Sequence, residues 1–358
     1  MFDHVKQFKG DKIFQHLDRL AQWQRGEKPV PVTVEIDSTN LCNLKCYYCS
    51  FGEYIKNDRV SLNREDMLRV IGEMAGLGVR GLTFTGGGEP LVNPHTLEAV
   101  EFAKKSGLDV AFITNGILLS EKASSIILNN CTWLRVSLDA SNPEMYRKMH
   151  GVSAGTFDKV VENIRAAARI KKRLGSKCTL GVGYLTGEDS YAGILEATTL
   201  CKSLGVDYIQ FRPVTFNSPG TKFQQYEKDL WLKIEPLMQD AFKESTKSFD
   251  VLFSVAKYGD LDKPNLGRHY RKCLGQHFAA VVGASGDMWV CCHLRGNPRY
   301  SLGNIKEQSF REIWFSSKRD RIMNSIDLKN DCMPLCRLHP QNKILWDLKN
   351  ATFHKNFL

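Results

Sequence analysis

Three cysteines fall within eight residues near the start of the chain. Cys42, Cys46 and Cys49 have CxxxCxxC spacing, with an aromatic residue, Tyr48, immediately before the third. Their thiolates can converge on one inorganic centre, yet a structural zinc site normally has four protein ligands. A cubane iron–sulfur cluster held by three cysteines leaves one iron free to bind another molecule. The spacing therefore predicts a metal centre with one open coordination position.

A glycine-rich turn follows at the end of the next expected strand. Three glycines, Gly86, Gly87 and Gly88, precede Glu89 and Pro90. Glycine allows the backbone to approach a ligand closely, and the Glu89 carboxylate can accept hydrogen bonds from a cationic amine. Such turns end many strands, so this one gains meaning only from the cysteines that precede it.

Together, the CxxxCxxC spacing and the Gly-Gly-Glu turn resemble the signatures of the radical S-adenosylmethionine (SAM) superfamily. The resemblance implies that Cys42, Cys46 and Cys49 hold a [4Fe–4S] cluster whose open iron chelates SAM. The reduced cluster of that family cleaves SAM to methionine and a 5′-deoxyadenosyl radical, which abstracts hydrogen from a substrate. The cofactor contacts expected from the resemblance are Tyr48, Gly86, Gly87, Gly88, Glu89, Asn115, Ser137 and Asp139.

Two of these residues carry a more specific expectation. Ser137 and Asp139 end the fourth expected strand, and the resemblance implies that they face the ribose of SAM. Asp139 could instead simply cap the turn that follows the strand.

A second group of cysteines lies in the last quarter of the chain. Two β runs, 278–282 and 288–290, read as a hairpin around Gly286, and a helix containing Trp314 follows. This arrangement resembles the SPASM or twitch-type extension of radical SAM enzymes, which implies one auxiliary [4Fe–4S] cluster. A structural zinc site is the alternative. The expected ligands are Cys273, Cys291, Cys332 and Cys336.

Cys292 makes the hairpin ligand ambiguous because it adjoins Cys291. If Cys292 is not a ligand, it could be a hydrogen-donating thiol at the active site or an inert buried thiol.

Composition indicates an ordinary globular protein. The chain has 358 residues, of which 42% are hydrophobic and 25% charged. Eleven cysteines in ligand-like spacings suit a reducing compartment, and no apolar run suggests a membrane span or signal peptide. We therefore expect a cytoplasmic protein without membrane association, in which Cys131, Cys178 and Cys201 are core residues.

The net charge of +10 is concentrated near the C-terminus. From Arg268 onward, the chain has fifteen Lys and Arg residues and seven Asp and Glu residues, a net charge of +8. A basic region could offset the charge of a cluster, bind an anionic substrate or RNA, or simply be a solvated surface. No RNA-binding motif is present, so nucleic acid is an unlikely partner. An RNA-modifying protein and a non-catalytic metal-binding scaffold remain the alternatives from other functional classes.

The remaining pattern predicts how these groups are positioned. Strands alternate with helices six times, which demands parallel strands and gives too few units for a closed eight-stranded barrel. The predicted fold is α/β: a partial (β/α)6 barrel followed by a small α+β auxiliary domain of a β-hairpin plus a helix. The expected strands are 31–36, 79–85, 108–114, 133–138, 180–185 and 207–212.

The expected domain organisation follows from these elements. A helical lead-in precedes the radical SAM core, and a helical connection joins that core to the auxiliary domain. The corresponding ranges are 1–30 for the lead-in, 31–215 for the core, 216–267 for the connection, 268–340 for the auxiliary domain and 341–358 for a C-terminal tail.

These expectations define a reaction class. The lead-in offers no room for a peptide-binding domain, which favours a small-molecule substrate such as a sugar, an aminocyclitol or a natural-product intermediate. Oxidation with the auxiliary cluster as electron acceptor is the first prediction; epimerisation, elimination and maturation of a ribosomal peptide are alternatives. A flavodoxin- or ferredoxin-type protein is the expected electron donor. The expected substrate contacts are Tyr184, Gln210 and Arg212.

Overall fold

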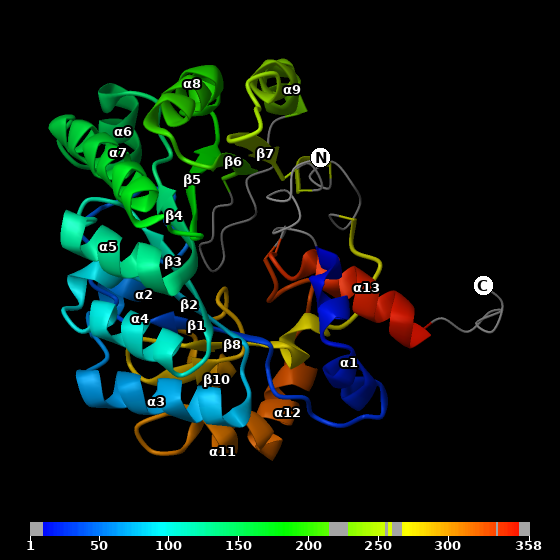
Figure 1. Ribbon diagram of the computed structural model, residues 1–358. Helices are drawn as coiled ribbons and strands as arrows, with labels where there is room; N and C mark the ends of the chain where they lie inside the picture. The colour runs from blue at the N-terminus through cyan, green and yellow to red at the C-terminus, as the bar shows by residue number, and fades with distance from the viewer. Residues whose placement is uncertain (1–9, 215–227, 255–256, 260–266, 334–335, 351–358) are drawn as a thin grey trace.

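The computed structural model describes residues 10–214, 228–254, 257–259, 267–333 and 336–350 (Figure 1). In these ranges the strands form one ten-stranded sheet with the order β10-β9-β8-β1-β2-β3-β4-β5-β6-β7. The first seven strands, which are mutually parallel, are β1 (Thr33–Asp37), β2 (Gly81–Thr85), β3 (Asp109–Thr114), β4 (Cys131–Ser137), β5 (Thr179–Thr186), β6 (Tyr208–Pro213) and β7 (Asp250–Phe253).

Helices cover one face of this curved sheet, on the left of Figure 1. Their apolar stripes drive this packing, as on α7, where Val160, Ile164 and Ala167 are fully buried. We call the opposite face of the sheet the inner face. The covering helices are α3 (Arg64–Leu77), α4 (Thr96–Lys105), α5 (Glu121–Asn130), α6 (Pro143–His150), α7 (Gly155–Leu174) and α8 (Ile194–Leu204).

The predicted α/β fold class is confirmed, and each of the six expected strands lies within two residues of its observed bounds. Helix boundaries follow capping chemistry. Asn63 accepts a hydrogen bond from the backbone N–H of Asp66 at the start of α3, and Gly78 ends that helix at φ 95°. Cys131, Cys178 and Cys201 are buried in the main core, as expected.

The sheet extends beyond the six expected strands at both ends. The segment expected to be a helical connection contains α9 (Lys228–Phe242) and also β7, which pairs with β6. At the other edge, β8 (Ala279–Val282) lies parallel to β1 and forms the predicted hairpin with β9 (Asp287–Trp289). The auxiliary hairpin is thus continuous with the core sheet.

The rest of the C-terminal region packs beside this hairpin. β10 (Ser301–Asn304) pairs with β9, and the expected helix containing Trp314 is α11 (Phe310–Phe315), followed by α12 (Ser317–Ser325). The predicted hairpin-plus-helix arrangement is therefore confirmed, with one additional strand.

The two ends of the described chain pack together. Much of the expected tail is helical, since α13 spans His339–Asn350 and lies beside the lead-in elements η2 (Gly10–Gln15) and α1 (Leu17–Gln24) (Figure 1). No helix in the described ranges has the length and apolar character of a bilayer span. The apolar cluster at this junction comprises Ile13, Leu20, Trp23, Leu274, Phe278 and Leu345.

Candidate active site

The cysteine loop, residues 42–49, lies beyond the carboxyl end of β1. Cys42, Cys46 and Cys49 are all partly buried there. The backbone N–H of Lys45 donates to the carbonyl of His150 at 2.9 Å, which fixes the loop against the end of α6. Within the described residues, no three His, Cys, Asp or Glu side chains converge tightly enough to hold a single metal ion. The assignment of the three cysteines as cluster ligands remains a prediction.

The glycine turn packs directly against the chain that leads into this loop. A Cβ on Gly88 would lie 2.1 Å from the carbonyl oxygen of Leu41, and one on Gly87 would lie 2.3 Å from Oδ1 of Asn40. The N–H of Glu89 donates to the same Leu41 carbonyl at 2.9 Å. Only glycine fits these positions, so the two motifs form one unit.

Glu89 is 2% exposed, and its carboxylate joins the turn to the end of β3. Oε1 accepts from Thr114 Oγ1 at 2.7 Å and from the N–H of Leu91 at 3.1 Å, and Oε2 accepts from the N–H of Asn115 at 2.7 Å. Burial raises the pKa of Glu89 to about 6. The structure shows Glu89 organising the backbone of the site, and its contact with the amine of SAM remains a prediction.

Asn115 links the hydrogen bonds of Glu89 to the cysteine loop. Its Nδ2 donates to Oδ1 of Asn43 at 2.6 Å and lies 4.0 Å from Sγ of Cys42. Asn115 is therefore held where a cofactor contact is expected.

Tyr48 and Asp139 form a buried pair beneath the loop. The Tyr48 hydroxyl donates to Oδ2 of Asp139 at 2.9 Å, and the N–H of Leu185 donates to Oδ1 at 2.8 Å. Asp139 has φ 52°, a left-handed conformation that is uncommon for residues other than glycine. Both oxygens of Asp139 therefore have protein donors, as a turn-organising residue requires. Ser137 is partly exposed at the end of β4, and the ribose contacts of both residues remain predictions.

The sequence interpretation missed His150. This residue is fully buried; its Nδ1 lies 3.0 Å from Sγ of Cys46 and its Nε2 lies 3.0 Å from the carbonyl oxygen of Leu138. His150 is 104 residues from Cys46 and ends α6 before Gly151, so its sequence context resembles an ordinary helix terminus. No spacing signal could have linked it to the loop.

Among the expected auxiliary cysteines, Cys336 packs against Ala279 on β8 of the hairpin. Burial raises the pKa of Cys273 to about 12 and that of Cys332 to about 12, and in both cases Cys336 adds to the effect. N–H groups approach three of the sulfurs. These contacts are Asn342 Nδ2 to Cys273 at 3.6 Å, Arg268 Nη2 to Cys332 at 3.6 Å and Leu338 N to Cys336 at 3.3 Å.

The two neighbouring cysteines after β9 differ in their surroundings. Burial raises the pKa of both Cys291 and Cys292, and the choice of Cys291 as the ligand from the hairpin remains a prediction. Cys292 packs against Val281 and Trp289. Its proposed role as a hydrogen donor remains a prediction.

A buried ion network, also missed from sequence, joins the auxiliary segment to β1. Arg295 contacts Asp37 at 2.6 Å and Glu35 at 3.5 Å, and Arg337 pairs with Glu35. The guanidinium carbon of Arg295 lies 4.3 Å from the ring centroid of Phe51, just beyond the cysteine loop. This network connects the two cysteine groups through a single strand.

The structure brings two of the three expected substrate contacts to the inner face. Gln210 and Arg212 lie there on β6, and Oε1 of Gln210 accepts from Nη1 of Arg135 at 3.4 Å. Tyr184 instead belongs to the core under the helices, where its hydroxyl donates to the carbonyl of Ser190 at 2.7 Å. The structure does not bring Tyr184 to the site.

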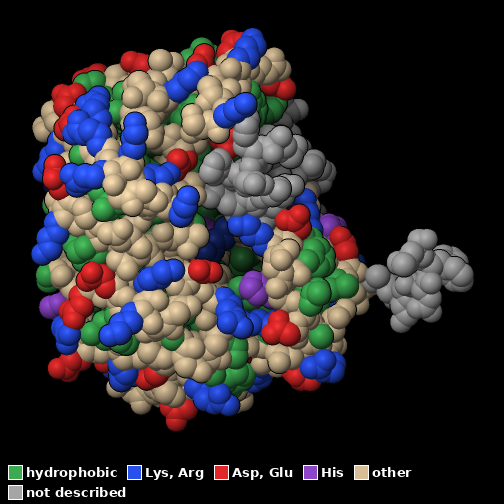
Figure 2. Space-filling view, viewed as in Figure 1, with side chains coloured by type: hydrophobic (Ala, Val, Ile, Leu, Met, Phe, Trp, Pro, Cys, Tyr) green, Lys and Arg blue, Asp and Glu red, His purple; other side chains and the backbone are tan. Residues whose placement is uncertain are grey.

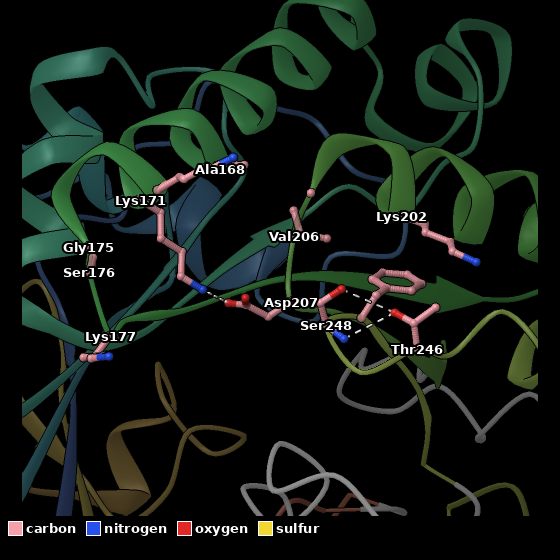
Figure 3. Close-up of a pocket in the computed structure, with 13 residues that line it drawn as sticks. Ala168, Lys171, Gly175, Ser176, Lys177, Lys202, Val206, Asp207, Thr246 and Ser248 are labelled. Carbon is pink, nitrogen blue, oxygen red and sulfur yellow. Dashed lines mark hydrogen bonds and ion pairs between the residues drawn. The ribbon is translucent and has the colours of Figure 1, made fainter.

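A separate pocket of about 800 Å³ lies at the opposite end of the strands (Figure 3). Lys171, Lys177 and Asp207 line it close to the starts of β5 and β6, with Lys171 paired to Asp207. Because the cysteine loop follows the carboxyl end of β1, this pocket is not part of the candidate active site.

Comparison with known families agrees with this geometry. The sequence model of the radical SAM superfamily matches residues 36–192, and that of an iron–sulfur cluster-binding domain, SPASM, matches residues 273–338. The chain therefore contains a radical SAM domain and a C-terminal SPASM iron–sulfur cluster-binding domain. These two domains imply SAM and two [4Fe–4S] clusters as cofactors, as predicted from the sequence.

Several curated proteins are similar to this chain. A protein of Alkaliphilus oremlandii named GTP 3′,8-cyclase is 28% identical over 64% of this chain and 69% of its own length. A protein of the same name from Limosilactobacillus fermentum is 30% identical over 61% of each chain. This chain therefore spans only about 61–69% of the length of these relatives.

Solved structures share the fold at low sequence identity. Streptococcus suis SuiB bound to S-adenosylmethionine has a TM-score of 0.64 and 16% identity, covering 87% of this chain and 72% of SuiB. Native anSMEcpe with bound AdoMet has a TM-score of 0.62 and 18% identity, covering 87% of this chain and 92% of that protein. These structures establish that this chain has their α/β architecture.

Proposed function

We propose that this protein is a radical SAM oxidoreductase that removes hydrogen from an unactivated C–H bond of a small molecule. When bound, SAM and the first cluster would supply the hydrogen-abstracting radical and the auxiliary cluster would take the second electron, so that the substrate loses two electrons and two protons in all.

The observation that carries this proposal is the parallel pairing of β1 with β8. Thr33 is in register with Ala279 and Ile36 with Val282, so the strand entering the cysteine loop lies beside the strand entering the auxiliary hairpin. Arg295 strengthens this junction through its ion pair with Asp37. Two redox centres on adjacent strands suit an enzyme that passes an electron from its substrate to the second centre.

The protein's own residues have positioning roles in this reaction. In the proposed assignment, Cys42, Cys46 and Cys49 hold the first cluster while the glycine turn and Asn115 orient SAM. Asp139 keeps the end of β4 in place through Tyr48 and Leu185. These groups lie at the carboxyl ends of the strands, where α/β proteins usually bind ligands.

The small-molecule assignment draws on the relatives named GTP 3′,8-cyclase, since that name specifies a nucleotide. The alternatives are epimerisation or elimination on the same class of substrate and maturation of a ribosomal peptide. Cys292 would have to return a hydrogen atom in the epimerisation, so a Cys292→Ala variant that still epimerises would exclude that role.

Iron content tests the two-centre assignment. After anaerobic reconstitution, the wild-type protein should contain about eight iron atoms, and Cys273→Ala or Cys332→Ala should contain about four. Cys201→Ala, at a core cysteine, is the matched control and should keep the wild-type value. Zinc in place of iron, or no loss of iron in the auxiliary variants, would contradict the proposal.

A further inference from the structure

Three cationic side chains gather on the inner face of the sheet. On β4, Leu134 and Val136 pack in the helix-side core, and on β6, Ile209 and Phe211 do the same. Because successive strand residues point to opposite faces, the intervening Arg135 and Arg212 point to the inner face. Lys257 follows β7 within one turn: its N–H donates to the carbonyl of Ser254 at 2.8 Å, and the N–H of Ser254 donates to the carbonyl of Phe211, beside Arg212, at 3.1 Å.

The two guanidinium groups flank a single glycine. A Cβ built on Gly183 of β5 would lie 3.3 Å from Cδ of Arg135 and 3.4 Å from Nη2 of Arg212. The absence of a side chain at Gly183 leaves room for both arginines on the inner face. Gly183, between the two arginines, thus marks the centre of a compact cationic group.

These cations lack acidic partners in the described part of the chain. No carboxylate there lies within 4.0 Å of the charged nitrogens of Arg135, Arg212 or Lys257. Nε of Arg135 and Nε of Arg212 are both buried without a hydrogen-bond partner. Asp139 acts on Arg212 only at longer range, since Tyr48 and Leu185 occupy its oxygens.

Such an arrangement is costly without a counter-ion. Arg135 donates to Gln210 through Nη1 at 3.4 Å, but the buried Nε–H groups of Arg135 and Arg212 lose their hydration without replacement, and neighbouring like charges add to the cost. Burial, followed by the charge of Arg135, lowers the pKa of Arg212 to about 10. Burial, followed by the charge of Arg212, lowers the pKa of Lys257 to about 8. Unsatisfied buried donors of this kind often indicate an absent ligand or ion.

We propose that Arg135, Arg212 and Lys257 bind a phosphate group of the substrate. Guanidinium groups bind phosphate through paired hydrogen bonds, and lysine adds a compact positive charge. A phosphate group carries up to two negative charges, so it offsets three cations better than a single carboxylate does. This inference rests on the proposed function and narrows its substrate to a phosphorylated small molecule.

The location of the group suits such a substrate. Arg135 lies two residues before Ser137 on the strand that ends at the candidate SAM site. A phosphate bound here would hold the substrate on the inner face beside that strand. Figure 2 shows a recess near the centre of one face of the molecule, with Lys and Arg side chains within it and at its edge.

Phosphate binding can be tested without knowledge of the full substrate. The anaerobically reconstituted holoenzyme with SAM, but without reductant, is titrated with inorganic pyrophosphate at constant ionic strength, and thermal unfolding is followed. The wild-type unfolding midpoint should rise with pyrophosphate concentration and reach a plateau. Arg135→Met and Arg212→Met should each raise the half-saturating concentration of pyrophosphate at least tenfold.

The ligand-free midpoints separate a binding role from a structural one. Replacement of this partly buried cation, which has no carboxylate partner in the described part of the chain, by methionine relieves charge repulsion, so Arg212→Met should unfold at or above the wild-type temperature when no anion is present. A large decrease would indicate that Arg212 is structural and would overturn the proposal.

Two comparisons locate the site and identify its ligand. Lys172→Met/Lys177→Met alters the pocket of Figure 3 and should respond to pyrophosphate like the wild type. The proposal is overturned if pyrophosphate does not raise the wild-type unfolding midpoint, or if only the Lys172→Met/Lys177→Met variant loses that rise. A larger rise with malonate than with pyrophosphate would also overturn it. Release of 5′-deoxyadenosine by the wild type on addition of dithionite tests the proposed function separately, so the two can fail independently.

Discussion

At the scale of single residues, Asp139 shows how the site depends on a side chain in an unusual backbone conformation. Its two oxygens satisfy the Leu185 N–H and the Tyr48 hydroxyl, and its φ is 52°. We predict that Asp139→Ala lowers the free energy of unfolding by about 2–4 kcal/mol, because it leaves both donors unsatisfied and strains the backbone. Urea unfolding of the reconstituted protein measures this change.

Asp139→Asn is the matched comparison. Asparagine tolerates a left-handed conformation and retains an acceptor for the Leu185 N–H, so it should recover most of the lost stability. Equal losses in the two variants would show that the hydrogen bonds of Asp139 do not hold the turn.

Chemistry at this scale could be predicted from the sequence only where it is encoded by local spacing. The cysteine loop and the glycine turn have such spacing, and the structure packs the turn against Asn40 and Leu41, which lead into the loop. His150 and Arg295 do not, because each reaches the site through tertiary packing from a distant element. Tyr184 was expected at the site from its place near the end of a strand, but strand alternation directs it into the helix-side core.

At the scale of elements, the inner face of β5 has no side chains at Gly181 and Gly183. A Cβ on Gly181 would lie 2.0 Å from Cζ of Tyr208 on the neighbouring strand. We predict that Gly181→Ala lowers the free energy of unfolding by about 1–3 kcal/mol through overpacking, as measured by urea unfolding.

A second substitution shows whether Tyr208 causes that loss. In a Tyr208→Leu background, Gly181→Ala should lower the free energy of unfolding by clearly less, because the obstructing ring is gone. Gly76→Ala on α3 is the control, because its Cβ would meet nothing within 4 Å and should maintain or increase stability. An unchanged cost in the double variant would contradict this packing account.

The junction of η6 (Gly275–His277) with α1 carries a pH-sensitive group. Burial, reinforced by the charge of Arg319, lowers the pKa of His277 from 6.5 to about 4, and the ring of Trp23 lies 6.3 Å away. The unfolded chain therefore binds this proton more readily than the folded chain, so stability should fall as the pH decreases from 6.5 towards 4.

This effect predicts a variant with a flatter pH profile. Between pH 6.5 and 4, His277 should lower the free energy of unfolding of the wild type by on the order of 2–3 kcal/mol. His277→Gln should lack this decrease, as measured by urea unfolding across that range. His269→Gln, at an exposed histidine beside Asp347, is the control. The assignment fails if the wild type and His277→Gln have the same dependence on pH.

Fold prediction succeeded where periodicity is strong and failed where pairing depends on distant segments. The first six strands and the hairpin have clear β patterns with glycine or polar turns, so their positions could be predicted. The parallel pairing of β1 with β8 joins residues about 245 positions apart, and local patterns carry no signal for it. β7 spans only Asp250–Phe253, which is too short to stand out in sequence.

At the scale of the whole molecule, one buried arginine adds to the β1–β8 pairing and the Arg337–Glu35 ion pair in attaching the auxiliary segment to the core. Arg295 offsets the charges of Asp37 and Glu35 on β1. We predict that Arg295→Met lowers the free energy of unfolding by about 3–5 kcal/mol, because both carboxylates lose a buried partner. Urea unfolding of the reconstituted protein checks this prediction.

Arg299→Met provides the control for this substitution. Arg299 is an exposed arginine that lies 3.8 Å from Asp331, so its loss should change stability by about 0–1 kcal/mol. Equal effects of the two substitutions would show that the buried network does not hold the auxiliary segment to the core.

The central claim is that the cysteine loop supports reductive cleavage of SAM, and release of 5′-deoxyadenosine measures this most directly. Anaerobically reconstituted wild-type protein and Cys201→Ala should both release the nucleoside when given SAM and dithionite, and Cys46→Ala should release none while retaining its fold. Release by Cys46→Ala at the wild-type rate, or no release by an iron-loaded wild-type protein, would contradict the account.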